Sequence, residues 1–271
     1  MTFVLVSVFL GIIVGVVSSL FGIGGGIFIV PILPSLIVMT HHQAIATSLA
    51  AVFLVTLLNT VGFAREQLVN WRTGLMLGVP SGIMAFVSGP WAAAVGDIAL
   101  RVFFLFILFV LLIITFFRRN LPPLGEEALT ITKAKGFFAL LFAIIAGFVS
   151  AFTGIGAGVI LSPIMFNLKM VRARELVPTT NLSTMLTTFS GSLSYFLLDL
   201  KSDGDLIDKP LALSLFLVAT ITALWMRPLQ KRLSQSTKVV VLCGVLFFIV
   251  LKEGYELYAM HVIEKVIKQW L

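Results

Sequence analysis

One stretch of eleven residues occurs twice in the chain, and this repeat limits the possible folds more than any other feature. FGIGGGIFIVP, residues 21–31, returns as TGIGAGVILSP, residues 153–163. Five of its positions keep an offset of 132, namely Gly22, Ile23, Gly24, Gly26 and Pro31. After one inserted residue, TSL (47–49) aligns with TNL (180–182). Internal similarity on this scale indicates a repeated structural unit. We therefore interpret the chain as two homologous halves.

Both halves divide into apolar segments in the same order. The chain is 59% hydrophobic and only 11% charged, whereas a soluble domain contains about 25% charged residues. Long apolar runs are typical of membrane-spanning helices. The predicted segments are 2–21, 26–38, 43–63, 73–96 and 100–117 in the first half, and 136–152, 157–168, 177–198, 210–226 and 238–258 in the second. We predict an all-α polytopic membrane protein with ten membrane segments.

The predicted domains follow from these segments. Residues 1–117 form the first repeat of five segments, and residues 136–258 form the second. Between them, 118–135 contains prolines, a glycine and charges, which indicates a linker. The tail, 259–271, has apolar residues on one helical face and is predicted to be an amphipathic interfacial helix. The second segment of each half is short, because 13 helical residues span only about 20 Å of a bilayer core about 30 Å thick.

The basic residues of the loops predict the topology. If the short segments cross the membrane, 13 Lys and Arg residues lie on one side and 6 on the other; if they dip in and return, the division is 11 to 8. Cytoplasmic loops are enriched in Lys and Arg, so the first division is favoured and the linker is cytoplasmic. Five crossings per half is an odd number, so the second repeat is inverted and both termini are non-cytoplasmic. No basic residue precedes the first segment, which favours a permanent helix over a removable signal peptide.

The glycine-rich stretches have three interpretations. A dinucleotide fingerprint requires glycine at the sixth position, which is Ile27 in one copy and Val159 in the other, so this interpretation is rejected. The G-x-x-x-G spacing alone favours helix packing. A broken helix is the third interpretation, favoured by the additional glycine, by the short segment that follows and by the duplication. Free backbone N–H groups at the start of a short helix attract anions.

The distribution of charge supports the broken-helix interpretation. The acidic and basic residues near the predicted segments fall close to segment ends, whereas proton relays and cation pumps usually need a carboxylate inside a spanning helix. Backbone N–H groups can bind a small oxyanion without a buried cation. The candidate binding residues are Gly22, Gly24, Gly25, Gly26, Gly154, Gly156 and Gly158, with Thr47, Ser48, Thr180 and Asn181 as additional hydroxyl or amide donors.

A stripe of polar side chains along segment 177–198 suggests a substrate pathway. The candidate pathway residues are Asn59 in the first half and Thr184, Thr187 and Ser194 in the second. The alternative is that these side chains form hydrogen bonds between helices or to their own backbone, which is common in membrane helices. The sequence leaves both interpretations open.

The repeated motif resembles that of the TauE/SafE family of sulfite exporters. The resemblance rests on GIGGG after the first segment, the proline that closes the next segment, ATSL (46–49), and the second copy GIGAGVILSP, and it covers essentially the whole chain. One position departs from the pattern, since Ala157 stands where the first half has Gly25. The resemblance implies a prokaryotic transporter of the inner (plasma) membrane that moves small sulfur-containing anions such as sulfite or sulfonates.

We expect a secondary transporter that works by alternating access, since inverted repeats with interrupted helices recur in such proteins. An anion channel, a transporter of another small organic anion and a non-transporting scaffold remain alternatives. The sequence shows no metal-ligand cluster and no nucleophile with a base partner, so we expect no enzyme, no metal and no cofactor. The expected partners are a small anionic sulfur compound and the lipid bilayer, without nucleic acid. Homo-oligomer formation is left open.

Overall fold

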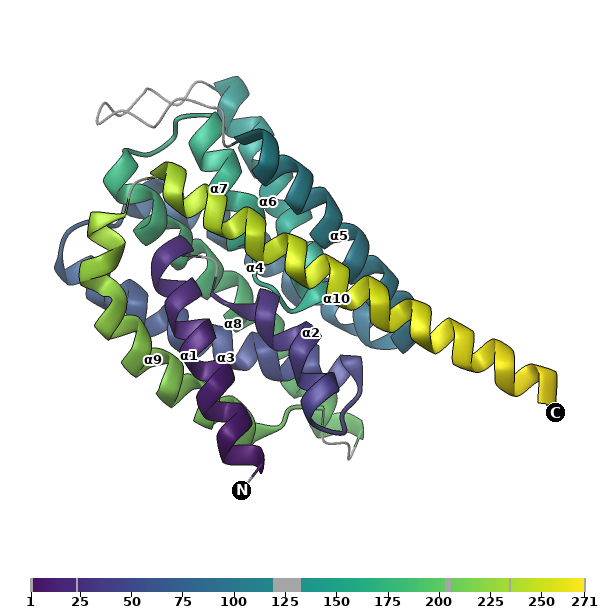
Figure 1. The fold of residues 1–271 in the computed structure, drawn as a ribbon. Coiled ribbons are helices and arrows are strands. Elements are labelled where there is room, and N and C mark those ends of the chain that lie inside the picture. Colours follow the sequence, from purple (N-terminus) through teal and green to yellow (C-terminus); the bar gives the residue numbers. More distant parts are fainter. Residues whose placement is uncertain (1, 23, 119–132, 203–205, 234, 271) are drawn as a thin grey trace.

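The structure is a computed structural model, and it describes residues 2–22, 24–118, 133–202, 206–233 and 235–270. These residues form helices and contain no strand. The helices are α1 Thr2–Phe21, α2 Gly26–Leu36, α3 His41–Arg65, α4 Trp71–Ala94, α5 Asp97–Arg118, α6 Lys133–Thr153, α7 Gly158–Asn167, the 3-10 helix η1 Ala173–Glu175, α8 Leu176–Ser202, α9 Lys209–Arg232 and α10 Gln235–Trp270. Figure 1 shows them packed into one bundle, from which the end of α10 projects.

Each predicted membrane segment corresponds to one α-helix, and the ends differ by a few residues. α3 begins two residues before its predicted start because Thr40 caps it: the Thr40 hydroxyl accepts from the Gln43 N–H, and the Gln43 side chain accepts from the Thr40 N–H. α10 continues as a helix through the predicted tail to Trp270. Most of the predicted linker, 118–135, lies outside the described residues.

Length and composition mark five of the described helices, α3, α4, α5, α6 and α9, as able to cross a membrane. α1, α2 and α7 contain shorter apolar stretches. Large apolar side chains, including Phe106 and Phe109 on α5 and Phe247 and Phe248 on α10, are half or more exposed on the surface of the bundle. A soluble protein rarely exposes so much apolar surface. The fold is therefore that of a helical multi-pass membrane protein.

The helices of the two halves pack mainly against each other. α1 lies along α9 and α6 lies along α4, while α3 contacts α8 and α5 contacts α10. α4 packs on α8, and α3 packs on α9. When the helices are numbered from the start of each half, these contacts are symmetric. The first helix of each half packs on the fourth helix of the other half, and the third helix of each half packs on the fourth helix of the other. The two third helices contact each other, and so do the two fifth helices. The core of the bundle thus lies between the helices α1 to α5 and the helices α6 to α10.

Two glycine contacts show that this correspondence extends to single residues. A Cβ atom on Gly15 would collide with the Ala219 carbonyl oxygen, and one on Gly147 would collide with the Ser81 carbonyl oxygen. Gly15 and Gly147 have the sequence offset of the repeat. Glycine at these positions lets α1 approach α9, and α6 approach α4, closely enough for backbone contact. The same local packing therefore occurs twice.

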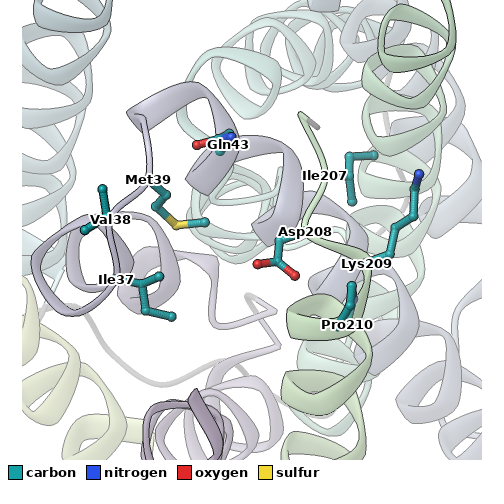
Figure 2. Close-up of a pocket in the computed structure, with 8 residues that line it drawn as sticks. All are labelled: Ile37, Val38, Met39, Gln43, Ile207, Asp208, Lys209 and Pro210. Atoms are coloured by element: carbon teal, nitrogen blue, oxygen red, sulfur yellow. The ribbon is translucent and has the colours of Figure 1, made fainter. Parts of the chain in front are cut away.

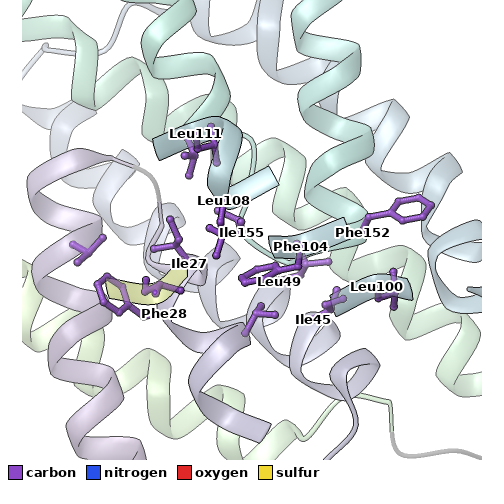
Figure 3. Packing of buried hydrophobic residues seen from close by; sticks show 14 of the residues in the cluster. Ile27, Phe28, Ile45, Leu49, Leu100, Phe104, Leu108, Leu111, Phe152 and Ile155 are labelled. Carbon is purple, nitrogen blue, oxygen red and sulfur yellow. The ribbon is translucent and has the colours of Figure 1, made fainter. Parts of the chain in front are cut away.

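A buried apolar cluster surrounds the ends of α2 and α6. Ile27 of α2, Ile45 and Leu49 of α3, and Phe104 of α5 lie in it together with Ile155, which follows α6. Figure 3 shows these side chains gathered between helices of both halves. Their burial fixes the segments that follow α1 and α6 inside the bundle, because apolar side chains in the interior are closely packed.

Candidate functional site

The first glycine-rich stretch separates two helices inside the bundle. α1 ends at Phe21, and α2 begins at Gly26. The φ angles are 70° at Gly22, 77° at Gly24 and 80° at Gly25. Residues with a side chain rarely adopt this left-handed conformation, whereas glycine does so readily. The extra glycines are therefore explained by the backbone path, and the predicted helix break is present here.

The second glycine-rich stretch forms an equivalent break. α6 ends at Thr153 and α7 begins at Gly158, with φ angles of 68° at Gly154 and 88° at Gly156. Ala157, the position that departs from the first copy, has a right-handed φ of −69°. Its equivalent Gly25 is left-handed, so the substitution matches a real difference between the two breaks.

The two breaks are buried and lie against each other. A Cβ atom on Gly26 would collide with the Gly154 carbonyl oxygen. A Cβ atom on Gly24 would collide with Val52 and lie 3.4 Å from Thr184 Cγ2. One on Gly156 would lie 2.9 Å from the same Thr184 methyl group. The breaks thus meet at one place between α3 and α8.

Backbone donors are available at this meeting point. None of the described residues accepts a hydrogen bond from the backbone N–H of Gly24, Gly25, Gly156 or Ala157. All four residues are buried. Buried N–H groups are almost always paired in native proteins, with protein, water or ligand. Since these groups also lie at the positive ends of the α2 and α7 dipoles, the arrangement suits a small anion.

Ser48 and Asn181 brace the breaks from equivalent positions. The Ser48 hydroxyl, on α3, donates to the Gly154 carbonyl oxygen at 2.8 Å. Asn181, on α8, stands against Gly22, where a Cβ would lie 3.0 Å from Asn181 Nδ2. That nitrogen donates to the Val177 carbonyl oxygen, and the buried Oδ1 has no partner among the described residues. A helix of each half therefore contacts the break of the other half.

Thr47 and Thr180 are buried, but their hydroxyl groups are engaged elsewhere. The Thr47 hydroxyl accepts from the Asp208 N–H at 3.1 Å, just before α9. The Thr180 hydroxyl donates to the Leu176 carbonyl oxygen at 2.7 Å. Their role as donors to a substrate stays a prediction. The structure adds a different contact for Thr47, which joins α3 to the start of α9.

The four candidate pathway residues form hydrogen bonds within α8 or to other helices, and Thr187 does both, because its hydroxyl also lies 2.5 Å from Ser81 Oγ on α4. Thr184 and Thr187 donate to carbonyl oxygens one turn earlier in α8, at 2.8 Å in each case. Asn59 Nδ2 donates to Ser18 Oγ on α1 at 3.0 Å, and Ser194 donates to the Phe86 carbonyl oxygen on α4 at 2.9 Å. These bonds agree with the packing alternative. Of the four residues, Thr184 is the one placed against both breaks.

Sequence reasoning did not identify Thr56 as part of the site. A Cβ on Gly24 would lie 3.4 Å from Thr56 Cγ2, and one on Gly156 would lie 3.2 Å from Thr188 Cγ2. Thr56 follows Val52 by one helical turn, and Thr188 follows Thr184 by one turn. Helical spacing from the residues at the breaks could therefore have identified both.

One buried charge is an exception to the expected absence of charge within the predicted segments. Glu253, in segment 238–258, is 1% exposed on α10. The neighbouring Lys252 ammonium contacts the Pro31 carbonyl oxygen and lies 2.6 Å from Ser35 Oγ and 2.7 Å from Glu256 Oε1. This cluster lies at the C-terminal end of α2, where a cation stabilises the last carbonyl groups. It is separate from the glycine breaks at the other end of α2.

Comparisons with known proteins agree with a membrane transporter. A probable membrane transporter protein of Haemophilus influenzae is 30% identical over 209 residues, which are 72% of this chain and 75% of that protein. A probable membrane transporter protein of Methanocaldococcus jannaschii is 28% identical over 194 residues, covering 69% of this chain and 70% of that protein. YunE of Bacillus subtilis, also a probable membrane transporter protein, is 25% identical over 217 residues, covering 73% and 79%.

No solved structure shows a significant match to the chain. The sequence model of the sulfite exporter TauE/SafE family matches residues 7–252, which include both glycine breaks, most of α1, all of α2 to α9 and the first half of α10. The family resemblance of the repeated motif is thereby confirmed. This chain belongs to the TauE/SafE family of sulfite exporters.

Proposed function

We propose that this protein is a secondary transporter that carries small sulfur-containing anions, such as sulfite or sulfonates, across the inner (plasma) membrane. The main support is the pair of buried breaks. Their backbone N–H groups at Gly24, Gly25 and Gly156 have no hydrogen-bond acceptor among the described residues. Three or four such donors match the oxygens of a sulfite or sulfonate group. The positive ends of α2 and α7 add to the attraction. Family membership supports the choice of sulfur oxyanions.

The proposed architecture is ten membrane segments in two inverted repeats of five, with both termini outside the cytoplasm. The reciprocal helix contacts and the paired Gly15 and Gly147 contacts support it. The directions of α3 and α8 support it as well. Thr47, near the start of α3, is hydrogen-bonded to Asp208, which follows the end of α8. Thr179, near the start of α8, is hydrogen-bonded to Asn70, which follows the end of α3. These two equivalent helices are therefore antiparallel.

Alternating access is the proposed mechanism. The breaks are buried, so an anion bound between them has to be exposed by movement of one repeat against the other. The relatives are named as probable membrane transporter proteins, and we propose no enzymatic step. An anion channel and a transporter of another small organic anion are the alternatives. A channel would need a continuous pore past Val52 and Thr184, which lie against both breaks.

Flux through proteoliposomes tests this function. Purified protein is reconstituted, and uptake of labelled sulfonates, sulfite and thiosulfate is measured with and without unlabelled compound inside. A transporter gives saturable uptake that is accelerated by internal substrate. Linear, non-saturating flux would favour a channel, and saturable uptake of carboxylates alone would favour another organic anion. Absence of binding and flux for every sulfur anion would contradict the proposal.

A further inference from the structure

A cavity of about 330 Å³ lies between the link from α2 to α3 and the start of α9. Apolar side chains, including Met39, form most of its wall, and Gln43, Asp208 and Lys209 also line it. Figure 2 shows Met39, Gln43 and the Asp208 carboxylate around the opening, with Lys209 on the α9 side. A cavity of this size holds a small molecule.

The wall of the cavity is bonded to a residue of α3 that lies next to the glycine breaks in the chain of contacts. The Asp208 N–H donates to the Thr47 hydroxyl at 3.1 Å, and the next residue of α3, Ser48, donates to the Gly154 carbonyl oxygen at 2.8 Å. Thr47 and Ser48 are both fully buried. Two consecutive side chains of α3 therefore connect the cavity to the second break.

Lys209 is a cation at the rim of the cavity. Lys209 is 62% exposed in its side chain and lies 3.6 Å from Asp199, so its ammonium group remains accessible to solvent. The Asp208 carboxylate is occupied at the start of α9, where one oxygen accepts from the Leu211 N–H at 2.9 Å. The Lys209 ammonium is thus the group of the wall that attracts an anion, and the carboxylates of Asp208 and Asp199 oppose it.

A similar set of hydrogen bonds lies at the opposite end of the bundle. The Asn70 N–H donates at 3.0 Å to the hydroxyl of Thr179, which is one residue before Thr180, the residue that aligns with Thr47. Asn70 Nδ2 also donates to Glu175 Oε2 at 3.3 Å. Gln43 is the counterpart of Glu175 at the repeat offset, and it lines the open cavity together with Asp208. Asn70 and Glu175 are thus hydrogen-bonded at one end of the bundle, whereas Gln43 and Asp208 line a cavity at the other end.

We infer that this cavity is the extracytoplasmic vestibule of the transport pathway, in which a small sulfur oxyanion binds on its way to or from the glycine breaks. This inference rests on the proposed function. The bond between Asp208 and Thr47 separates the vestibule from the breaks. The start of α3 lies on the non-cytoplasmic side in the proposed topology, so the vestibule opens outward.

Cysteine labelling tests the vestibule. The single cysteine is removed by Cys243→Ala, and Met39→Cys is introduced in the cavity wall. Gly96→Cys is the matched control, because Gly96 is exposed before α5 and a Cβ there meets no atom within 4 Å. A membrane-impermeant maleimide is added to intact cells or right-side-out vesicles, with and without a small sulfonate. The Kd of the sulfonate is measured separately on each purified variant.

Both cysteines are expected to react from outside. At a sulfonate concentration of about ten times Kd, labelling of Met39→Cys should slow about tenfold, since the free fraction falls by that factor. Labelling of Gly96→Cys should not change. Val38→Cys, fully exposed at the cavity wall, repeats the test if the first variant does not fold.

Two results would overturn the inference, and they differ in what they imply for function. If the purified variants bind the sulfonate but labelling at both wall positions is unaffected by it, the vestibule is wrong and the proposed transport function stands. If labelling occurs only from the cytoplasmic side, the vestibule is likewise wrong. Absence of binding to any sulfur anion removes the proposed function and the inference together.

Discussion

The Ser48 hydroxyl, on α3 of the first half, donates a hydrogen bond of 2.8 Å to the carbonyl oxygen of Gly154, in the break of the second half. Both residues are buried, and Gly26 of the first break lies against the same carbonyl oxygen. The geometry of one break therefore depends on a helix of the other repeat. Movement of one repeat relative to the other necessarily alters this contact.

Replacement of Ser48 by alanine should destabilise the second break. The buried Gly154 carbonyl oxygen would lose its donor, which costs about 1–3 kcal/mol. We expect a lower melting temperature and weaker sulfonate binding. Ser88→Ala is the control, since the Ser88 hydroxyl is also buried but bonds within its own helix, to the Met84 carbonyl oxygen. Thermal unfolding in detergent and calorimetric titration measure both effects. Equal effects from the two variants would show that Ser48 has no special role.

The difference between the two breaks predicts opposite tolerance at equivalent positions. Gly25→Ala places a Cβ in a left-handed conformation, which costs about 1–2 kcal/mol, and 2.8 Å from Val14 Cγ1. Ala157→Gly meets no such strain, because φ is −69°, and should cost less than about 1 kcal/mol. Thermal unfolding compares the two single variants. A larger loss of stability for Ala157→Gly would contradict the conformations described for Gly25 and Ala157.

The helices and the helix breaks could be predicted from the sequence, while the contacts that complete the site could not. Apolar segment length and the duplicated glycines located α2 and α7 to within two residues. The bond from Asp208 to Thr47 joins residues far apart in sequence, and only the packing of α9 on α3 creates it. Glu253 was missed because it follows a long apolar run, where a charge is expected to be exposed, and its burial depends on how α10 packs in the bundle.

The Asn181 amide offers a test of the charge of the ligand. Asn181→Asp would place a carboxylate beside Gly22, where a bound anion is repelled by the added charge. We expect loss of detectable sulfonate binding. Asn181→Leu is the uncharged control with the same branching, and it should retain weakened binding because the backbone donors remain. Calorimetric titration of folded, monodisperse protein compares them. Unchanged affinity in Asn181→Asp would place the anion away from the first break.

Lys252 is predicted to stabilise the end of α2 through its contacts with Pro31, Glu253 and Glu256. Lys252→Met leaves the buried Glu253 without its cation, and we expect a loss of about 1–3 kcal/mol. The double variant Lys252→Met/Glu253→Gln should regain part of this stability, because the uncompensated buried charge is removed. Thermal unfolding of the two variants measures the difference. A double variant less stable than Lys252→Met would show that the Glu253 carboxylate is stabilised without Lys252.

The paired bonds at the two ends of the bundle predict opposite effects on access to the breaks. Thr184 lies against both breaks, so Thr184→Cys in a Cys243→Ala background reports access to them. A small impermeant methanethiosulfonate is added from outside, and the rate of labelling is measured. Thr47→Val removes the acceptor of the Asp208 N–H and should favour the outward-open state. Thr179→Val removes the acceptor of the Asn70 N–H and should favour the inward-open state. A bond worth about 1 kcal/mol changes each population by a factor of about 5. Labelling should accordingly rise in the first variant and fall in the second.

Thr60→Val, which removes a buried hydroxyl with no hydrogen-bond partner among the described residues, is the control and should leave the labelling rate unchanged. A change of the same sign in both variants would mean that the two bonds do not oppose each other across the breaks.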